Sequence, residues 1–401
     1  MSHSGHRTRR GKKGWLGAAL AAGLLVSACT GASPATPPPA TPVAPTAVPP
    51  TAVVPTAVPP TAVPATATAC AGTKPTGTGL SETLVGANGE AGVASSTVTI
   101  SDADLAAAKT ALTGKTIAIS QHIGVADYTR QVVGAASDIL KAAGAKIVTS
   151  DANFDPAKQV SDIENLLTQQ PALLIVFPVD QAATVPGIKA ANAANVPVVV
   201  VGSALKEGGD YASLITADNF EGGVIAADEM ITLVGDTGEA AIVPYKFSLW
   251  HVDERVRGFR AGVACTGIQI VEDKQTCTNE TDCVGVFADI LTAHPNLKAG
   301  FGAYDGIGLG MNAAASTAGW KGTVVTHDLG LATAQAIASK TAPLKATASQ
   351  ETLDQGTTAG RIALKVILGQ EVPKLVFSPV TPTTVDNVAA EYLKLFGKPL
   401  Q

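Results

Sequence analysis

Apolar positions after the first quarter of the chain fall into two alternating kinds of segment. Short continuous apolar runs, such as 172–177 and 197–201, are typical of strands covered on both faces of a sheet. Between them, apolar residues recur at helical spacing, as in Val160, Ile163 and Leu167. Strands that alternate with helices predict parallel sheets with right-handed crossovers. Ligands bind such sheets beyond the carboxyl ends of the strands, so those ends are where we expect function.

The pattern predicts most elements individually. The expected strands are 116–120, 146–150, 172–177, 197–201, 213–217, 239–243, 268–271, 299–303 and 322–326, with 345–348 extended. The expected helices are 101–112, 131–143, 223–233, 254–264, 284–293, 308–318, 331–339 and 357–368, with others beginning at Pro156 and near Val185. Asp155 is expected to cap the helix that begins at Pro156. Residues 121–129 and 244–252 are expected to be loops at strand ends.

The first 29 residues have the pattern of an export signal. A basic segment precedes the apolar run 16–26, which is too short to remain as a membrane-spanning helix. The run ends in Val26-Ser27-Ala28-Cys29, and small residues before a cysteine resemble a bacterial lipobox, with Cys29 as the lipid-modified residue. An ordinary signal peptide with a chance cysteine is the alternative.

A Pro-, Ala-, Thr- and Val-rich segment follows, in which residues 30–69 carry no charge and the unit PTAVPPTAV recurs. Such a segment cannot bury a core and predicts a polyproline II spacer. At about 3.1 Å per residue it could hold a domain on the order of 100 Å from a membrane. We therefore assign 1–29 to a lipoprotein signal peptide, 30–75 to a disordered linker and 76–114 to a lead-in segment with a helix.

Composition narrows the class of partner. The formal charge is −5, and because the expected signal removes five basic residues and no acidic one, the remaining chain carries −10. An acidic domain argues against nucleic acid as the partner. The sequence contains no HExxH, GxSxG or P-loop motif, and GIGLG at 306–310 misses the spacing of a dinucleotide-binding loop. Those glycines are explained more simply as the start of a helix.

The remaining cysteines are Cys70, Cys265, Cys277 and Cys283. An even number in an exported protein predicts disulfides, and three full pairings are open. We expect one bridge among the last three, closing the loop EDKQTCTNETDC. A CxxC metal site is absent from the sequence.

Residues 116–398 resemble the ribose-type, type I periplasmic sugar-binding proteins. The resembling stretches, in the family's order, are DPAKQVSDIENLLTQQ, FPVDQAATVPGIKAANAANVPVVVV, TADNFEGG, DERVRGF, LTAHPNLKAGFGAYD and VVTHDLG. The resemblance implies an α/β fold of two Rossmann-like lobes with parallel sheets, joined by a three-crossover hinge. We expect one lobe at 115–219 plus 351–378 and the other at 220–350 plus 379–401.

The resemblance also implies a function. It identifies the chain as an extracytoplasmic solute-binding lipoprotein that captures a monosaccharide or polyol for an ABC importer, with the membrane permease as its partner. We expect a monomer without a cofactor or metal, held at the cell membrane by its lipid alone. The alternative is a sensor-coupled receptor for chemotaxis or two-component signalling with the same fold. An enzyme has the least support, and a repressor effector domain would carry a DNA-binding headpiece in place of the lipobox.

The family's ligand-binding positions can be carried over to this sequence. Asp328 and Gln350 stand where the family has a ligand-binding Asp and Gln, and Tyr304 and Asp305 where it usually has an Asn. Tyr128, with Asp127 before it, falls where the family has aromatic residues that sandwich the sugar ring. Helix capping by Asp305 and Asp328 and core packing of Tyr128 are the alternatives. The full candidate set is Gln121, His122, Asp127, Tyr128, Ser203, Trp250, His251, Tyr304, Asp305, Asp328 and Gln350.

The sequence also departs from the family pattern. Gly202-Ser203 stands where the ribose pattern has an Asp-Arg pair, and a second ligand arginine would fall near Asp253. Arg255 belongs to the RxxGF pattern, and we interpret it as structural. These losses argue against ribose itself as the ligand. Trp250, in the expected loop, is predicted either to stack on a sugar ring or to pack against its own lobe.

His122, His251 and His327 each follow a strand at the expected cleft edge, whereas His294 lies on a helix–strand turn. Histidines that converge with aspartates can bind a metal or make pH-dependent ligand contacts. No local spacing supports a metal, so we favour hydrogen bonds to the ligand, with unrelated packing roles as an equal alternative.

Overall fold

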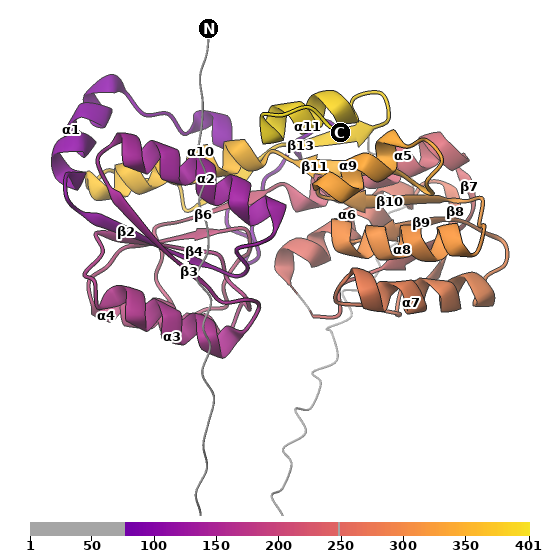
Figure 1. Cartoon of the computed structure of the whole chain (residues 1–401), viewed down its shortest axis with the longest axis horizontal. Helices are drawn as coiled ribbons and strands as arrows, with labels where there is room; N and C mark the ends of the chain where they lie inside the picture. Colours follow the sequence, from indigo (N-terminus) through magenta and orange to yellow (C-terminus); the bar gives the residue numbers. More distant parts are fainter. Residues whose placement is uncertain (1–76, 248) are drawn as a thin grey trace, which may run out of the picture. The chain divides into compact units, whose positions relative to one another are not determined.

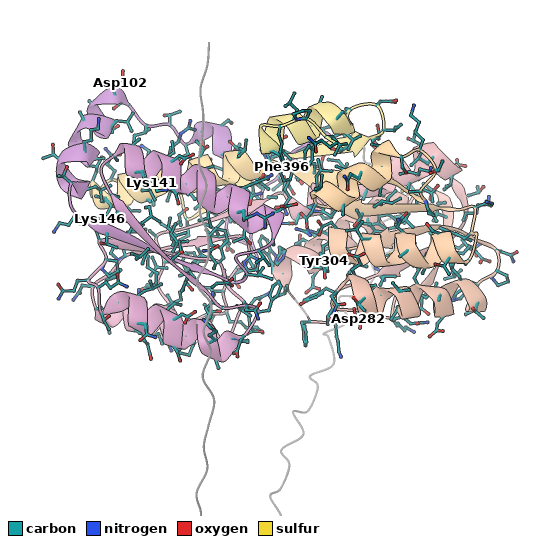
Figure 2. All side chains as sticks on the ribbon, viewed as in Figure 1. Asp102, Lys141, Lys146, Asp282, Tyr304 and Phe396 are labelled. Carbon is teal, nitrogen blue, oxygen red and sulfur yellow. A yellow bond between two sulfur atoms is a disulfide. The ribbon has the colours of Figure 1, made fainter. Side chains whose placement is uncertain are left out.

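The computed structural model describes residues 77–247 and 249–401 (Figure 1). The expected signal peptide, Cys29, Cys70 and the Pro-rich linker lie outside these residues. Within the described part of the chain, every helix is too short or too polar to span a membrane. Side chains fill the space between the helices and the sheets (Figure 2).

A seven-stranded parallel sheet forms the first lobe, in the strand order β1-β12-β6-β5-β4-β2-β3. Its strands are β1 Val93–Ala94, β2 Thr116–Gln121, β3 Lys146–Asp151, β4 Leu173–Val176, β5 Val198–Val201, β6 Ser213–Ala217 and β12 Leu375–Ser378. The strands β4, β5 and β6 are buried along their whole length, which the continuous apolar runs predicted for β4 and β5.

Helices cover both faces of this sheet because successive strand residues point to opposite sides. On one face, α1 Asp102–Leu112, α2 Asp127–Ala142 and α10 Thr352–Ile367 share a core with Ile117 and Ile119. On the other face, α3 Pro156–Leu167 and α4 Val185–Ala193 pack against Ala118 and Leu174. The predicted cap of α3 is confirmed, since the Asp155 carboxylate accepts a hydrogen bond from the Lys158 backbone N–H at 3.0 Å.

A six-stranded sheet forms the second lobe, in the order β13-β11-β10-β9-β7-β8. Its strands are β7 Thr237–Val243, β8 Gly267–Glu272, β9 Leu297–Gly302, β10 Thr323–His327, β11 Leu344–Gln350 and β13 Val380–Thr384, with β13 antiparallel to β11. Its helices are α5 Asn219–Val234, α6 Trp250–Val263, α7 Glu280–Ala293, α8 Asp305–Thr317, α9 Leu331–Ala338 and α11 Val388–Phe396.

The close packing of α5 on α6 explains a glycine of the DERVRGF stretch. A Cβ atom at Gly258 would lie 1.9 Å from the Phe220 carbonyl oxygen, and one at Gly223 would lie 2.0 Å from the Arg255 carbonyl oxygen. Real Cβ atoms do not approach backbone this closely, so both helices need glycine at the crossing.

The chain passes between the two sheets three times. The crossovers lie between β6 and α5, between β11 and α10, and between β12 and β13. The architecture is therefore that of two α/β lobes joined by a three-crossover hinge, as the family resemblance implied. The carboxyl ends of β2, β6, β10 and β11 lie toward this junction, which sets the place of the site.

Residues 77–98 form an N-terminal strap that contacts both lobes. On the first lobe, β1 extends the sheet by pairing with β12. Toward the second lobe, the backbone N–H groups of Thr78 and Gly79 donate to the Glu221 carboxylate. The Ser81 N–H donates to Asp218 at 2.7 Å, and the Val380 N–H donates to the Gly79 carbonyl at 2.9 Å.

Several helices begin earlier than predicted, which moves some candidate residues from loops into first turns. The helix α2 begins at Asp127 instead of residue 131, so Asp127 and Tyr128 are helical. The helix α6 begins at Trp250, so Trp250 and His251 also lie in a helix and the predicted loop 244–252 is shorter. The first turn of a helix need not carry apolar residues at helical spacing. The spacing of apolar residues therefore cannot locate where a helix begins.

A disulfide joins Cys277 to Cys283, which confirms the bridge expected among the last three cysteines. Cys265 is disulfide-bonded as well. The glycines of GIGLG lie in the first turns of α8, as predicted.

Candidate ligand-binding site

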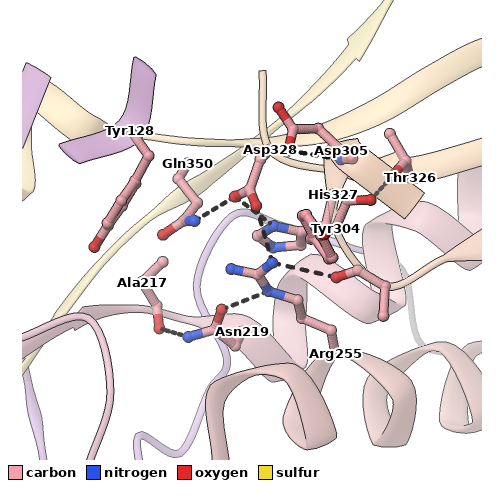
Figure 3. A network of polar contacts seen from close by, with 12 residues as sticks. Tyr128, Ala217, Asn219, Arg255, Tyr304, Asp305, Thr326, His327, Asp328 and Gln350 are labelled. Atoms are coloured by element: carbon pink, nitrogen blue, oxygen red, sulfur yellow. Dashed lines mark hydrogen bonds and ion pairs between the residues drawn. The ribbon is translucent and has the colours of Figure 1, made fainter. Parts of the chain in front are cut away.

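Asp328 is the centre of a buried polar cluster at the carboxyl end of β10 (Figure 3). Its carboxylate accepts a hydrogen bond from Arg255 Nη1 at 3.0 Å and another from the Gln350 side-chain amide. The His327 Nδ1 atom lies 3.0 Å from Asp328 Oδ1, the same oxygen that accepts from Gln350. We call Asp328, Arg255, His327, Gln350 and Asn219 the Asp328 network.

Arg255 comes from α6 and is only 3% exposed. Its Nε donates to the Asn219 side-chain oxygen at 2.9 Å, and its Nη1 also donates to the Ala303 carbonyl at 3.2 Å. Asn219 is held in turn, because its amide donates to the Ala217 carbonyl at 2.8 Å. The expected structural role of Arg255 agrees with these bonds, but the sequence did not indicate its ion pair with Asp328.

Electrostatics keep Asp328 charged and His327 neutral near pH 7. Burial alone would raise the pKa of Asp328, but the Arg255 guanidinium, His327 and Gln350 hold it well below its usual range. Burial lowers the pKa of His327 to about 4, so its imidazole is neutral near pH 7. Burial, together with the neighbouring charge of Asp328, raises the pKa of Asp305 to about 7. The site therefore presents one fixed carboxylate and one carboxyl group that titrates near neutrality.

Gln350 connects this network to the first lobe. Its side-chain oxygen accepts a hydrogen bond from Gln355 Nε2 at 2.9 Å, and Gln355 Oε1 accepts one from the Tyr128 hydroxyl at 3.0 Å. Burial, and next the charge of Asp328, raise the pKa of Tyr128, so the phenol stays protonated. The structure thus brings together Tyr128, Gln350 and Asp328, although their elements lie far apart in the sequence.

Asp127 and Asp305 also meet, on either side of Gly330. A Cβ atom at Gly330 would lie 3.1 Å from Asp305 Oδ2 and 3.2 Å from Asp127 Oδ2. Asp127 accepts a hydrogen bond from the Leu331 N–H at 3.2 Å, which joins the first turn of α2 to that of α9. Asp305 accepts one from the Gly306 N–H at 2.8 Å, but it is the first residue of α8, whose N-cap residue Tyr304 makes no side-chain capping bond, so this bond is not the expected helix cap.

Tyr304 points away from the network, toward the disulfide loop. Its hydroxyl donates to the Thr278 carbonyl at 2.7 Å, and its ring packs edge-on against Tyr245 with 5.7 Å between centroids. Tyr304 and Asp282 of this loop are labelled in Figure 2. These contacts give Tyr304 a role in holding the loop closed by Cys277.

Trp250 lies in a different environment from the Asp328 network. Its ring is 6.5 Å from the Phe377 ring, and it lines a cavity of about 440 Å³ together with residues 81–85 of the N-terminal strap. Trp250 therefore packs against the first lobe, whereas the packing alternative expected it to pack against its own, second lobe. The cavity wall also includes Asn219, so the network and the cavity share one residue.

The remaining candidates are buried at strand or helix ends. Ser203 is 3% exposed, and its hydroxyl has no hydrogen-bond partner among the described residues. His251 Nδ1 also has no hydrogen-bond partner among the described residues. Burial, followed by the Arg255 charge, lowers the pKa of His251. Gly202 adopts a φ of +90°, and a Cβ there would lie 3.2 Å from the Tyr128 hydroxyl. Gln121 is buried at the end of β2.

His122 lies in an aromatic cluster at the end of β2. Its ring is 5.5 Å from Phe154, 6.0 Å from Phe177 and 6.3 Å from Tyr128. Burial lowers the pKa of His122 to about 4, so this imidazole too is neutral near pH 7. The cluster around His122 is therefore aromatic and uncharged, but the acidic Asp151 lies near it on the same lobe.

The networks around Asp328 and His122 also contain Asn219, Gln355 and Phe154, which the sequence did not indicate. The position of Asn219 directly after a strand was a usable signal, because strand ends carry the site in this fold. Gln355 and Phe154 had no local signal. Among the described residues, one group of three side chains has metal-ligand spacing, Cys277, Asp282 and Cys283, and its two cysteines form the disulfide.

The sequence and the structure of this chain are similar to those of known proteins. A family model described as periplasmic binding protein domain matches residues 117–371. The ribose import binding protein of Bacillus subtilis (strain 168) is 29% identical over 241 residues, which cover 60% of this chain and 77% of that protein. A solute-binding protein from Mycobacterium smegmatis, solved with bound glycerol, is 28% identical with a TM-score of 0.63, over 69% of this chain and 96% of that one. One from Agrobacterium vitis, solved with α-D-tagatopyranose, shares the fold at 23% identity, with a TM-score of 0.65 over 70% and 98%.

Proposed function

Because the chain belongs to the family of periplasmic binding protein domains, we propose that it captures a monosaccharide or polyol outside the cytoplasm and delivers it to an ABC importer. The relatives support this, since one imports ribose and others were solved with glycerol and with tagatopyranose. Their names concern import, which favours an importer over a sensor-coupled receptor. The observation that carries the proposal is the hydrogen-bonded pair of half-buried Asp328 and buried Gln350 at adjacent strand ends.

The network is suited to binding hydroxyl groups. Hydroxyls that leave water need hydrogen-bond partners, or binding loses the free energy of those bonds. The carboxylate of Asp328 accepts bonds from hydroxyls, and the amide of Gln350 can donate and accept. Arg255 and His327 hold Asp328 in one position, so no free energy is spent on ordering it when the ligand arrives. The carboxyl group of Asp305 can donate or accept a hydrogen bond, because its pKa lies near 7 and both its protonated and its ionised form are present near neutral pH.

We also propose how the chain is organised around this site. The lobes are assigned to 115–219 plus 351–378 and to 220–350 plus 379–401, in keeping with the strands that share each sheet. The protein acts as a monomeric binding protein and catalyses no reaction. A lipid on Cys29 holds it at the outer face of the cell membrane, and the linker places the lobes within reach of the permease.

A thermal-shift screen of the mature chain tests the proposal. The panel contains pentoses, hexoses, polyols and inositols, with amino acids and purine nucleosides as other classes of solute. A ligand at about 100 times its dissociation constant should add about 2.7 kcal/mol to the free energy of unfolding. Shifts with amino acids or nucleosides alone would overturn the assignment to sugars.

Substitutions locate the site once a sugar is found. Asp328→Asn and Gln350→Ala should weaken binding about tenfold to a hundredfold, since each removes hydrogen bonds that include a charged group or a buried amide. Asp386→Asn, on an exposed turn of the second lobe, is the matched control and should bind like the wild type. Full binding by both site variants would remove the Asp328 network as the binding site.

A further inference from the structure

A hydrogen bond joins the two lobes at a place that no crossover connects. The Leu331 N–H, in the first turn of α9, donates to Asp127 Oδ2, in the first turn of α2, at 3.2 Å. The helix α2 belongs to the first lobe and α9 to the second, and neither borders a crossover. Any hinge rotation that separates α2 from α9 therefore breaks this bond.

The helix α9 receives no cap from the residue that precedes it. That residue is Gly330, which has no side chain, and the backbone N–H groups of a first helical turn have no partner within the helix. Asp127 supplies a carboxylate oxygen to one of them from the other lobe. A negative charge at this end of a helix also interacts favourably with the helix dipole. The contact thus has the chemistry of a helix cap, although it is made between two lobes.

Arg130 fixes the Asp127 carboxylate in this position. Its guanidinium donates to Asp127 Oδ1 and to the Val125 carbonyl, while Asp127 Oδ2 faces α9. The approach to α9 is close, since a Cβ at Gly330 would lie 3.2 Å from Asp127 Oδ2, tighter than most Cβ contacts. The Asp127 side chain is 27% exposed, so the bond is largely shielded from water. Glycine at position 330 lets the carboxylate reach the helix.

The two partners of this bond belong to segments that also carry the candidate site. Asp328 and Leu331 lie in one short segment after β10, and Leu329 between them is buried in the second-lobe core. On the first lobe, Tyr128 follows Asp127 directly in α2. A change in how far apart the lobes lie at the Asp328 network is therefore felt at the bond between Asp127 and α9.

We infer that Asp127 is a latch, which holds the two lobes closed over the ligand by capping α9 and does not touch the ligand itself. This inference rests on the proposed function and deepens it, and it gives Asp127 a role other than the expected ligand contact. A bond that forms only on closure stabilises the closed state alone, so it mainly slows release of the ligand. It acts on every ligand by the same factor, whereas a residue that touches the ligand distinguishes one sugar from another.

Two substitutions of Asp127 separate these roles. The variant Asp127→Ala removes the latch, and the dissociation constant of every probe that binds should rise about fivefold, which corresponds to a helix cap of about 1 kcal/mol. Calorimetry with D-ribose, D-allose, myo-inositol and glycerol measures the affinities, and stopped-flow fluorescence should show the change mainly in the rate of release. The variant Asp127→Asn keeps an oxygen that can accept the same bond and should stay within about twofold of wild type.

Asp102→Ala is the matched control. Asp102 is the first residue of α1, as Asp127 is of α2, and it lies in the same lobe far from α9 (Figure 2). This substitution removes the same charge from the same position of a helix. It should leave the affinity for every probe unchanged.

Amide hydrogen exchange of the ligand-free protein tests the contact without a ligand. Asp127→Ala should speed exchange of the Leu331 N–H, in the opposite lobe, about fivefold, and Asp102→Ala should not. Unchanged exchange at Leu331, equal affinities in wild type and Asp127→Ala, or fold-changes that differ among the probes would each refute the latch and leave the proposed function intact. If no sugar or polyol binds the wild type, the proposed function fails, and the inference fails with it.

Discussion

Replacing Arg255 by methionine tests how much its ion pair with Asp328 contributes to the stability of the protein. Methionine is flexible and fills much of the same space, so the change removes charge and hydrogen bonds more than packing. Arg255 is 3% exposed and lies 3.0 Å from the Asp328 carboxylate. At that distance and an effective dielectric constant of about 20, the attraction is roughly 5 kcal/mol, and the cost of burying both charges offsets much of it.

Removing one partner leaves the other charge buried and unpaired, which costs about 3–5 kcal/mol. We therefore expect Arg255→Met to lower the free energy of unfolding by that amount in a denaturant titration at pH 7. Asp328→Asn in the same background should recover part of the loss, because no unpaired charge then remains. The double-mutant cycle measures this coupling directly.

The contribution of Asp328 to the free energy of unfolding changes with pH in a definite direction. Because the pKa of Asp328 is lowered in the folded protein, its contribution is present above the unfolded pKa of about 4 and is lost as the pH falls below it. The difference between wild type and Arg255→Met should therefore shrink in acid. A loss below about 1 kcal/mol at pH 7, or strict additivity in the cycle, would contradict the assignment of Arg255 and Asp328 as a coupled pair.

Two further variants probe the neighbouring structure. In wild type, burial and Asp328 raise the pKa of Asp305 to about 7, so the folded state loses stability as the pH rises from about 4 to 7. Asp305→Asn lacks this loss, and its stability relative to wild type, from denaturant titrations, should increase between pH 4 and pH 8; a constant difference would be inconsistent with a raised pKa. Gly258→Ala should lower the free energy of unfolding by about 1–3 kcal/mol, because its Cβ would lie 1.9 Å from the Phe220 carbonyl oxygen. Gly134→Ala in α2, where a Cβ meets nothing within 4 Å, is its control and should be neutral or stabilising.

The parts of the fold that were predictable are those whose sequence pattern is local. The run Pro197–Val201 is buried on both faces, and its continuous apolar sequence indicated this. The strand Leu375–Ser378 was missed, because its short apolar run is not distinct from part of a buried helix. The strand Val380–Thr384 was missed too, since Pro382 argues against a strand, and it is accommodated here in an edge strand.

The site was predictable only in part, for a different reason. Asp328 and Gln350 directly follow or end strands, and the fold brings strand ends together. The pair of Arg255 and Asp328 spans 73 positions and depends on how α6 packs against α5. Phe154 had no signal in the sequence, because its positive φ and its exposure depend on the backbone and the surroundings of the turn.

The N-terminal strap determines where a pulling force enters the folded part of the chain. Gly79 and Ser81 are bonded to Val380 and Asp218, which border two of the three crossovers. A load on the chain before Gly77 therefore acts close to the axis about which hinged lobes turn. Its lever arm is short and it exerts little torque on either lobe. Tension in a membrane tether would then neither open nor close the site, and the ligand would be held equally well by a slack or a stretched molecule.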